Sequence, residues 1–309
     1  MTEKPSCLSQ NDENATRYPI YIPSKGRATT GKTAHILAEE RLLFYLVVEP
    51  QEHDAYAKVF GEERLLVLPF RDAGTSVPAR NWIKKHAHAA GHERHWQLDD
   101  NINGFLRVWK GKRWITRAGI SLRAMEDFTD RYENIAISGP NYSFFVIGHK
   151  TPFNINVHVY SCMLILNETP FSFRGKRNED TDYCLQALSQ GWCTVLFNAF
   201  VIKKMQTMTM RGGNTDALYR EDGRLEMARE LERRWPGVVR TTRKFQRPQH
   251  HVYHGWQRFD TPLKLKEEVN LDELSAIDEY GMRLKMLRPS KTSNIERIRL
   301  YKERTDGEA

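Results

Sequence analysis

Cysteine is scarce in this chain of 309 residues, and no long hydrophobic run interrupts it. The four cysteines, Cys7, Cys162, Cys184 and Cys193, include no CxxC pair, which excludes a disulfide framework and a zinc finger. The chain contains no stretch of about 18 uncharged apolar residues, which is the length that a membrane-spanning helix needs. The polar N-terminus also lacks the apolar segment of a secretion signal. We therefore expect a soluble protein of the reducing cytoplasm, with no membrane partner.

Basic residues are in excess. Lys and Arg outnumber Asp and Glu by 47 to 39, for a formal net charge of +8. A positive balance favours an anionic partner such as nucleic acid. Enzymes that bind phosphorylated small molecules share this balance, so charge alone leaves both partners open.

The order of apolar segments indicates an α/β protein. Residues 1–16 are polar and aperiodic, and we expect them to be disordered. Four short apolar segments then alternate with helical patterns, which is typical of βαβ units and a mostly parallel sheet. The predicted strands are 18–22, 43–48, 65–69 and 96–98, and the predicted helices are 31–40, 52–59 and 77–90.

The following segments change the expected sheet from parallel to mixed. A hairpin around Gly111 is predicted from residues 105–109 and 112–115. Further predicted strands are 135–138, 142–147, 157–166 and 193–197, with helices over 117–131, 179–190 and 217–234. No internal repeat is found.

A glycine-containing segment, residues 26–33, matches the pattern GxxxxGK[ST] of a phosphate-binding P-loop and lies between a predicted strand and a predicted helix. Pro23, Ser24 and Lys25 separate its first glycine from the strand, whereas a P-loop glycine follows directly. The later segment HWQLDD is half polar and lacks the apolar run expected before a P-loop enzyme's metal-binding aspartate. A P-loop kinase or ATPase stays an alternative, beside a chance match in a helix entrance.

An acidic pair, Asp99 and Asp100, ends the predicted strand over 96–98. Ligands bind at the carboxyl ends of strands in open α/β sheets. Mg²⁺ and Mn²⁺ prefer oxygen ligands and are commonly shared between carboxylates and substrate phosphates. The segment indicates either a metal and phosphate site or an Asp-rich turn.

A second pattern precedes this strand: Gly74, four residues, then Ala79, Arg80 and Asn81 at the start of a helix. This order of glycine, Ala-Arg-Asn, helix, short strand and acidic pair resembles the nucleotide-sugar half of GT-A glycosyltransferases. Together with the opening segment YIPSKGR, residues 21–27, the chain resembles the TET/JBP-associated glycosyltransferase group over residues 18–215. Members of that group are encoded largely by bacteriophages and are linked to sugars on oxidised pyrimidines.

The resemblance implies a GT-A-like fold, a Rossmann-type mixed sheet flanked by helices. Residues 17–216 would form the glycosyltransferase domain, with a nucleotide-sugar half over 17–104 and an acceptor half over 105–216. Residues 217–309 would form a helical and basic C-terminal extension.

The resemblance also implies a donor site with a metal cofactor. The residues expected to bind the nucleotide sugar are Pro23, Ser24, Lys25, Arg27, Arg80, Asn81 and Asp99. Asp99 and Asp100 are expected to hold Mn²⁺ or Mg²⁺. GT-A enzymes often add a C-terminal histidine to the metal, for which His250 is the candidate. A structural histidine is the alternative, because His250 lies far beyond the acidic motifs.

A third acidic segment, residues 177–182, begins a predicted helix, where the helix dipole favours carboxylates. GT-A enzymes place an acidic residue here that faces the acceptor, and in inverting members it deprotonates the acceptor hydroxyl. By this resemblance Asp180 is the catalytic base, with Glu179 or Asp182 as substitutes. Ordinary acids of a first helical turn are the alternative.

Further candidate contacts to phosphate or acceptor are basic. One is a loop with backbone amides and an arginine, which is otherwise a plain surface loop. Its residues are Arg211, Gly212, Gly213 and Asn214. Lys203 and Lys204 either end a strand or neutralise the departing diphosphate. Residues 240–259 mix basic and aromatic side chains, which suits phosphate contacts and base stacking or, alternatively, a core.

These features predict a metal-dependent hexosyltransferase that moves a sugar from a UDP-sugar to a hydroxylated DNA base such as 5-hydroxymethylcytosine. Its partners would be a nucleotide sugar and modified DNA, in the host cytoplasm if a phage encodes it. Protein and small-molecule acceptors stay open, because the acidic pair and the Ala-Arg-Asn helix concern the donor. The rival functions are the P-loop enzyme, a sugar-phosphate nucleotidyltransferase of the same fold, and a non-catalytic DNA-binding module with a transferase-like fold.

Overall fold

The amino-terminal half folds into the βαβ units that its alternating pattern predicts. The computed structural model describes residues 16–146, 151–205, 223–244, 247–252, 255–270 and 273. The first strands are β1 (Ile20–Pro23), β2 (Tyr45–Val48), β3 (Leu65–Val67) and β4 (Arg94–Leu98), and the helices are α1 (Lys32–Glu39), α2 (His53–Phe60) and α3 (Val77–Ala89). The four strands pair in parallel, in the order β3-β2-β1-β4.

The following segment adds antiparallel strands. The elements are β5 (Ile102–Trp109), β6 (Lys112–Thr116), α4 (Ala118–Thr129), β7 (Ile135–Tyr142), β8 (Phe153–Ile155), β9 (Cys162–Leu166), α5 (Glu179–Ser189) and β10 (Cys193–Lys204). β5 and β6 form the predicted hairpin, in which Trp109 pairs with Lys112. Lys110 and Gly111 connect them, and both have a positive φ, 49° and 73°, as a tight hairpin turn requires.

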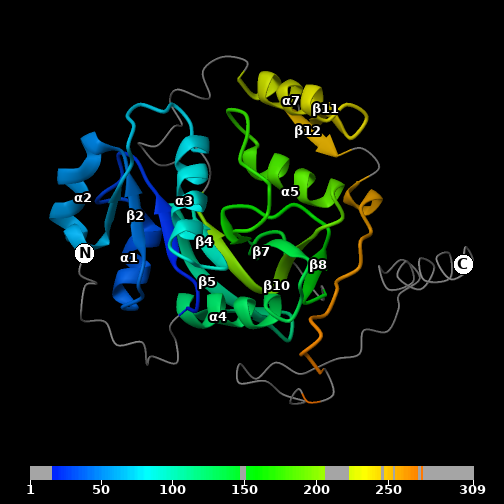
Figure 1. The fold of residues 1–309 in the computed structure, drawn as a ribbon, viewed down its shortest axis with the longest axis horizontal. Helices are drawn as coiled ribbons and strands as arrows, with labels where there is room; N and C mark the ends of the chain where they lie inside the picture. The colour runs from blue at the N-terminus through cyan, green and yellow to red at the C-terminus, as the bar shows by residue number, and fades with distance from the viewer. Residues whose placement is uncertain are drawn as a thin grey trace, which may run out of the picture.

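All these strands belong to one sheet with helices on both faces (Figure 1). Its order is β3-β2-β1-β4-β9-β7-β10-β5-β6, and β8 pairs with β10. β4 runs antiparallel to β9, while β7 and β10 run parallel. The predicted α/β class, with a mixed sheet flanked by helices, is confirmed.

The alternation of side chains along β1 shows how the two faces are covered. Ile20 and Ile22 lie in one core cluster with Leu37 of α1. Tyr21, which points the other way, lies in a second cluster with Ile83 of α3. Successive residues of a strand face opposite sides of a sheet, so these three residues bury both faces at once.

β4 lies inside the sheet, between β1 and β9, and all five of its residues are buried. Its polar side chains therefore need internal partners. Trp96 Nε1 donates to Glu126 Oε1 of α4 at 2.7 Å, and Gln97 Nε2 donates to the carbonyl oxygen of Arg80 in α3 at 3.0 Å. These bonds tie the strand to helices on both faces, and they hold the acidic pair that follows it in a defined place.

Two predicted strands are corrected. The strand over 142–147 does not form as predicted, because β7 ends at Tyr142 and the chain turns, with Phe145 N–H donating to Tyr142 O at 3.0 Å. In the segment 157–166 only Cys162–Leu166 is a strand, since Ser161 has a φ of 62° that interrupts the extended backbone. β10 runs beyond the predicted 193–197, and β8 was not predicted.

A helix and a hairpin near the C-terminus pack on the sheet domain. They are α7 (Gly223–Arg234), β11 (Val239–Lys244) and β12 (Arg247–Val252), and a short 3₁₀ helix, η3 (Trp256–Arg258), follows. Leu231, Val239 and Val252 form a core cluster with Leu185 of α5. Figure 1 shows α7 and the hairpin beside α5. The hairpin was not predicted, and the predicted disordered segment 1–16 lies outside the described residues except for residue 16.

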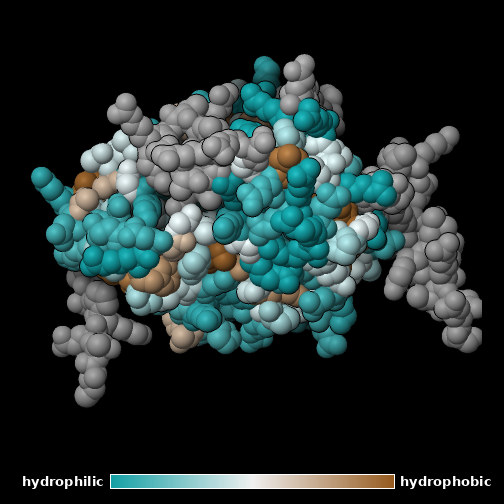
Figure 2. Space-filling model, turned by 90° about the horizontal axis from the view of Figure 1, so that it is seen from above, coloured by the Kyte–Doolittle hydropathy of each residue, from teal (hydrophilic) through white to brown (hydrophobic). Residues whose placement is uncertain are grey.

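The described surface is largely hydrophilic on the face shown in Figure 2, with small separate apolar patches. Among the helices that the structure describes, none has the length and apolar character needed to cross a bilayer.

Candidate active site

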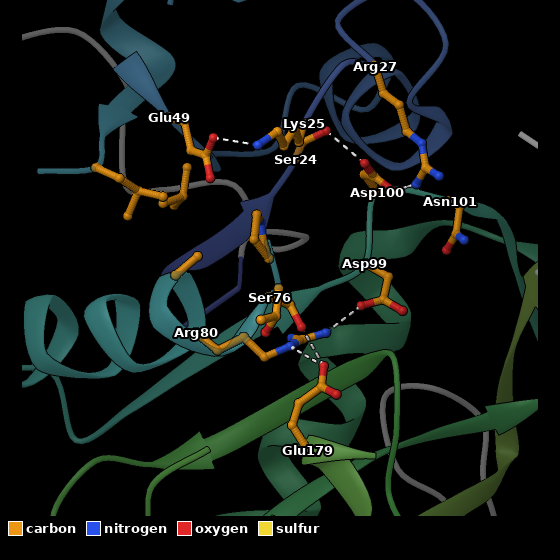
Figure 3. Close-up of a pocket in the computed structure, with 15 residues that line it drawn as sticks. Ser24, Lys25, Arg27, Glu49, Ser76, Arg80, Asp99, Asp100, Asn101 and Glu179 are labelled. Atoms are coloured by element: carbon orange, nitrogen blue, oxygen red, sulfur yellow. Dashed lines mark hydrogen bonds and ion pairs between the residues drawn. The ribbon is translucent and has the colours of Figure 1, made fainter. Parts of the chain in front are cut away.

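A cleft opens at the carboxyl ends of β1, β2 and β4 (Figure 3). The first turns of α3 and α5 close it from the other side. This is the edge at which open α/β sheets bind ligands. Its lining residues are Pro23, Ser24, Lys25, Arg27, Val47, Glu49, Leu68, Thr75, Ser76, Ala79, Arg80, Asp99, Asp100, Asn101 and Glu179.

The turn after β4 is fixed through its backbone. Asp99 N–H donates to the carbonyl oxygen of Ser161 at 2.7 Å. The Thr33 hydroxyl donates to Asp99 O at 2.5 Å and accepts from Ile102 N–H at 2.9 Å. These bonds hold the main chain of the turn, and the side chains of Asp99 and Asp100 both line the cleft.

Asp100 lies on the β1 side of the cleft. Its carboxylate accepts from Ser24 Oγ at 2.8 Å and from Arg27 Nη1 at 2.6 Å. Burial raises the pKa of Asp100, and the Arg27 guanidinium and Ser24 hydroxyl oppose that rise. The predicted donor residues Ser24 and Arg27 thus meet the predicted metal ligand Asp100 in space.

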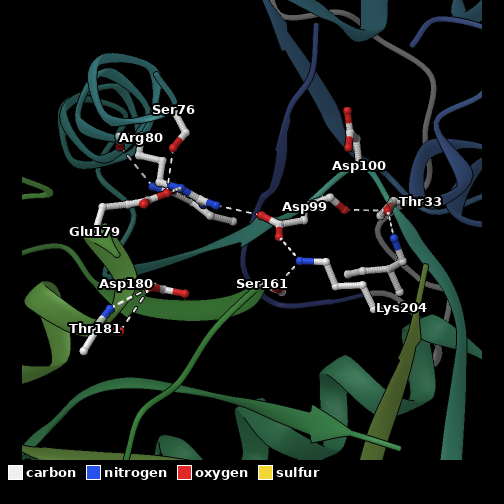
Figure 4. Close-up of polar contacts among 12 residues, drawn as sticks. Thr33, Ser76, Arg80, Asp99, Asp100, Ser161, Glu179, Asp180, Thr181 and Lys204 are labelled. Carbon is white, nitrogen blue, oxygen red and sulfur yellow. Dashed lines mark hydrogen bonds and ion pairs between the residues drawn. The ribbon is translucent and has the colours of Figure 1, made fainter. Parts of the chain in front are cut away.

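Asp99 lies between two cations, as Figure 4 shows. Arg80 Nη2 donates to Oδ1 at 2.6 Å, and Lys204 Nζ donates to Oδ2 at 2.7 Å. Burial acts to raise the pKa of Asp99, but Lys204 and Arg80 outweigh it and hold the pKa well below the usual range. The carboxylate is therefore ionised at any physiological pH.

Arg80 joins the acidic pair to the first turn of α5. Its guanidinium, only 6% exposed, also contacts Glu179 Oε1 through Nε at 3.3 Å. Ser76 Oγ donates to the same Glu179 oxygen at 2.6 Å. Burial raises the pKa of Glu179, and the Arg80 charge opposes that rise. Helix α3 therefore places one cation between two acidic residues of the cleft.

Glu49 is a cleft residue that the motif search missed. Its carboxylate accepts from Lys25 Nζ at 2.6 Å and from the backbone N–H groups of Asp72 and Ala73, each at 3.1 Å. Burial acts to raise the pKa of Glu49, but the Lys25 and backbone bonds outweigh it and lower the pKa. The sequence could have indicated Glu49, because this acidic residue directly follows the predicted strand 43–48, just as Asp99 directly follows β4.

Asp180 lies next to Glu179 within a group of polar and aromatic side chains. Its Oδ1 is 3.3 Å from His158 Nε2 and accepts from Thr181 N–H at 2.7 Å. Burial acts to raise the pKa of Asp180, but the His158 interactions and the Thr181 N–H outweigh it and lower the pKa to about 2. The carboxylate is 27% exposed, so an incoming hydroxyl group can reach it.

His250 of β12 belongs to this group and not to the acidic pair. Its Nε2 is 3.5 Å from the Thr181 hydroxyl. Burial and the neighbouring His158 lower the pKa of His250 to about 4. In the described ranges no three His, Cys, Asp or Glu side chains gather as a metal site. The structure thus does not bring His250 to Asp99 and Asp100, because β12 packs over α5.

Two predicted site residues face away from the cleft. Asp182 is fully buried and accepts from Arg174, Gln186 and Trp235, which leaves no path to a substrate. Asn81 bonds the backbone of Phe173 through both its amide nitrogen and its oxygen, each at 2.8 Å. Helical spacing explains both results. Asn81 follows Arg80 by one residue and Asp182 follows Asp180 by two, and residues so spaced do not share a face of a helix. The predicted acceptor loop 211–214 lies outside the described residues.

The geometry also contradicts the P-loop reading of residues 26–33. The N–H groups of Thr30 and Gly31 donate to the Arg27 carbonyl, so they do not face a phosphate. Thr33, which would hold Mg²⁺, is fully buried and bonded to Asp99 and Ile102. Lys32 is exposed and does not line the cleft.

Comparison with known proteins agrees with the predicted family. A protein-family model described as TET-Associated Glycosyltransferase matches residues 18–213. No curated protein matches the chain. Among solved structures, the inositol-1-phosphate CTP transferase from T. maritima matches 60% of this chain and 88% of its own, with 12% identity and a TM-score of 0.34.

Proposed function

Since the chain belongs to the TET-associated glycosyltransferase family, and is therefore a glycosyltransferase of TET-related base modification, we propose the substrates and the residues of its reaction. The donor is a UDP-sugar, and the acceptor is a hydroxylated base in DNA such as 5-hydroxymethylcytosine. The observation that carries the proposal is the cleft itself, in which Asp99 and Asp100 follow β4 and lie among Arg27, Arg80 and Lys204.

The cleft is suited to a nucleoside diphosphate. Its β1 and β2 side offers Ser24, Lys25 and Glu49, polar groups that can bind a ribose or a base. Its centre holds Arg80 with Lys204 beside it, two cations that can face a diphosphate and neutralise the charge that develops on it as it leaves. The nucleoside would therefore lie over β1 and β2, and the sugar would point toward α5.

Asp99 and Asp100 are the residues that would hold Mn²⁺ or Mg²⁺. Their donor set fits, because such ions take one or two carboxylates and complete their shell with phosphate oxygens and water. A bound ion would supply Lewis-acid stabilisation of the departing diphosphate. Both carboxylates are already paired with cations, so we expect the ion to bind weakly unless the donor is present.

Transfer then needs a base on the acceptor side, which is Asp180. The acceptor oxygen forms a bond to the sugar C1 as the bond from C1 to the diphosphate oxygen breaks, and UDP leaves with the electron pair. The hydroxyl proton passes to the Asp180 carboxylate. His158, 3.3 Å away, orients this carboxylate and can share the proton.

The test is incubation of the protein with Mn²⁺, a panel of UDP-sugars and duplex DNA that contains 5-hydroxymethylcytosine, followed by mass spectrometry of the digested nucleosides. We expect a hexose-sized mass gain that is lost in Asp99→Asn/Asp100→Asn. Asp54→Asn/Glu62→Gln is the matched control, because both carboxylates are exposed, lie outside the cleft and together carry the two negative charges that the test variant removes.

The rival functions give different outcomes in the same experiment. Donor hydrolysis without any modified nucleoside would keep the transferase and reject the DNA acceptor. Release of pyrophosphate from UTP and a sugar phosphate would identify a nucleotidyltransferase. DNA binding with no turnover of any donor would favour the non-catalytic module.

A further inference from the structure

A stack of aromatic side chains lies between the acidic pair and Asp180. Tyr142, at the end of β7, packs against Tyr160 with ring centroids 4.3 Å apart. The rings of Phe144 and Phe145 stack on Tyr142 at 5.3 and 6.0 Å. Tyr160 in turn contacts the His158 ring edge-on at 5.0 Å. Four aromatic rings thus lead from the end of β7 to the histidine that contacts Asp180.

The outer two rings are open to solvent. Phe144 and Phe145 are 52% and 53% exposed, whereas large apolar side chains are ordinarily covered. They follow each other in a turn that is held by two backbone bonds, Ser143 N–H to Ile202 O at 2.8 Å and Phe145 N–H to Tyr142 O at 3.0 Å. Their exposure is therefore built into a fixed turn.

The inner two rings hold this turn beside the reacting groups. The Tyr142 hydroxyl is 2.6 Å from Ser161 Oγ and 3.4 Å from Lys204 Nζ. Lys204 Nζ is itself 2.7 Å from Asp99 Oδ2. The Tyr160 hydroxyl donates to Asn141 Oδ1. The aromatic stack is thus anchored at one end to the diphosphate side of the cleft and at the other to the Asp180 side.

We infer that Phe144 and Phe145 form a stacking platform for the acceptor, a nucleobase extruded from a DNA strand. The inference rests on the proposed function, because it specifies the acceptor side of the same site. Planar bases stack on exposed aromatic side chains whatever their sequence, and an enzyme that modifies a base in duplex DNA must first flip it out. A platform of this kind would hold the extruded base at the Tyr142 end of the aromatic stack, whose other end contacts His158 beside Asp180.

The neighbouring hairpin provides charge for the DNA backbone. Arg113 of β6 donates to the carbonyl oxygen of Ser143 at 2.7 Å, which joins the hairpin to the platform turn. The same hairpin carries Lys110 and Lys112, and the exposed Trp109 and Trp114. Interleaved cationic and aromatic side chains match a negatively charged strand with stacked bases.

The test compares two fluorescent oligonucleotide duplexes, one with an unpaired cytosine and one with an abasic residue at the same position. Anisotropy titrations give Kd for the wild type and for Phe144→Ala/Phe145→Ala. We expect the wild type to prefer the unpaired base, and the variant to bind it about 5- to 100-fold more weakly while binding the abasic duplex unchanged. Phe144→Tyr/Phe145→Tyr should restore the preference, and Phe144→Leu/Phe145→Leu should not.

Equal affinity of the wild type and the alanine variant for the base-containing duplex would overturn the platform. An equal loss for both duplexes would also overturn it, since a general backbone contact or a folding defect would explain that result. UDP-sugar hydrolysis by the wild type tests the donor site independently. Failure of the wild type to use any nucleotide sugar would reject the proposed function, while the comparison of the two duplexes would still test the platform.

Discussion

Replacement of Asp180 by asparagine tests most directly whether Asp180 is the catalytic base. Asparagine has the same shape and still accepts the Thr181 N–H bond, but it cannot take a proton at neutral pH. General base catalysis contributes about 10²- to 10⁴-fold in rate, or about 3–5 kcal/mol of activation free energy. We therefore expect sugar transfer to fall by about that factor, with UDP-sugar affinity nearly unchanged, because Asp180 does not line the donor cleft.

The same substitution has a calculable effect on stability. The pKa of Asp180 is lowered from 3.8 to about 2, which corresponds to about 2 kcal/mol of stabilisation by the ionised carboxylate. A lowered carboxyl pKa stabilises the folded state above the unfolded value of 3.8 and loses this effect as pH falls toward 2. Urea titration at pH 7 should therefore show Asp180→Asn to be less stable by about 2 kcal/mol.

Substitution of His158 tests whether this residue acts through Asp180. If His158 orients Asp180, His158→Gln should reduce transfer, and the double variant should lose little more than Asp180→Asn alone. Single-turnover transfer to 5-hydroxymethylcytosine DNA measures all three, with Asp54→Asn as the control for a lost surface charge. Transfer by Asp180→Asn within threefold of the wild type would refute the assignment of the base, and fully additive losses would refute the pairing.

Three further predictions concern Lys204, His95 and Lys32. Lys204→Met removes one of the two cations beside Asp99, so we expect the free energy of unfolding in urea to fall by about 3 kcal/mol. Calorimetry should also show weaker UDP binding, and Lys204→Arg should restore both properties. Unchanged UDP affinity of Lys204→Met would contradict the role of Lys204. Burial lowers the pKa of His95 from 6.5 to about 3, so between these pH values the unfolded state binds a proton that the folded state does not. Stability should therefore fall as the pH is lowered from 6.5 to 3, by up to about 1.4 kcal/mol per pH unit. His95→Asn should flatten that part of the urea-midpoint profile, and an unchanged slope would count against the buried neutral histidine. Lys32→Ala should leave donor hydrolysis within twofold of the wild type, whereas a 100-fold loss would revive the P-loop.

Much of the fold can be predicted from the sequence because it depends on local patterns. Strands of three to five residues alternate with helices from Ile20 to Leu98, and an alternation of this kind is typical of parallel βαβ units. The hairpin at Lys110 and Gly111 is equally local, because a two-residue turn with positive φ needs a permissive residue. The strand predicted over 142–147 fails for the converse reason, since its apolar side chains are used in a turn and an aromatic stack.

The family also follows from local sequence. Gly74, the Ala-Arg-Asn segment and the Asp99-Asp100 pair occupy the ends of predicted elements, and ends of elements can be read from a chain without its fold. Local sequence is therefore enough to identify a glycosyltransferase of the TET-associated group, with its acidic pair at the carboxyl end of β4.

The side chains that act together are brought into contact by the packing of distant elements. Lys204 reaches Asp99 across 105 positions of the chain, because β10 ends beside the turn that follows β4. His158 meets Asp180 where an irregular segment passes the first turn of α5, and His250 joins them, away from the acidic pair, because β12 packs over that helix. Asp182 and Asp180 look interchangeable in sequence, yet the helix turns one into the core and leaves the other accessible. Such pairings depend on the approach of distant elements, which residue patterns along the chain do not encode.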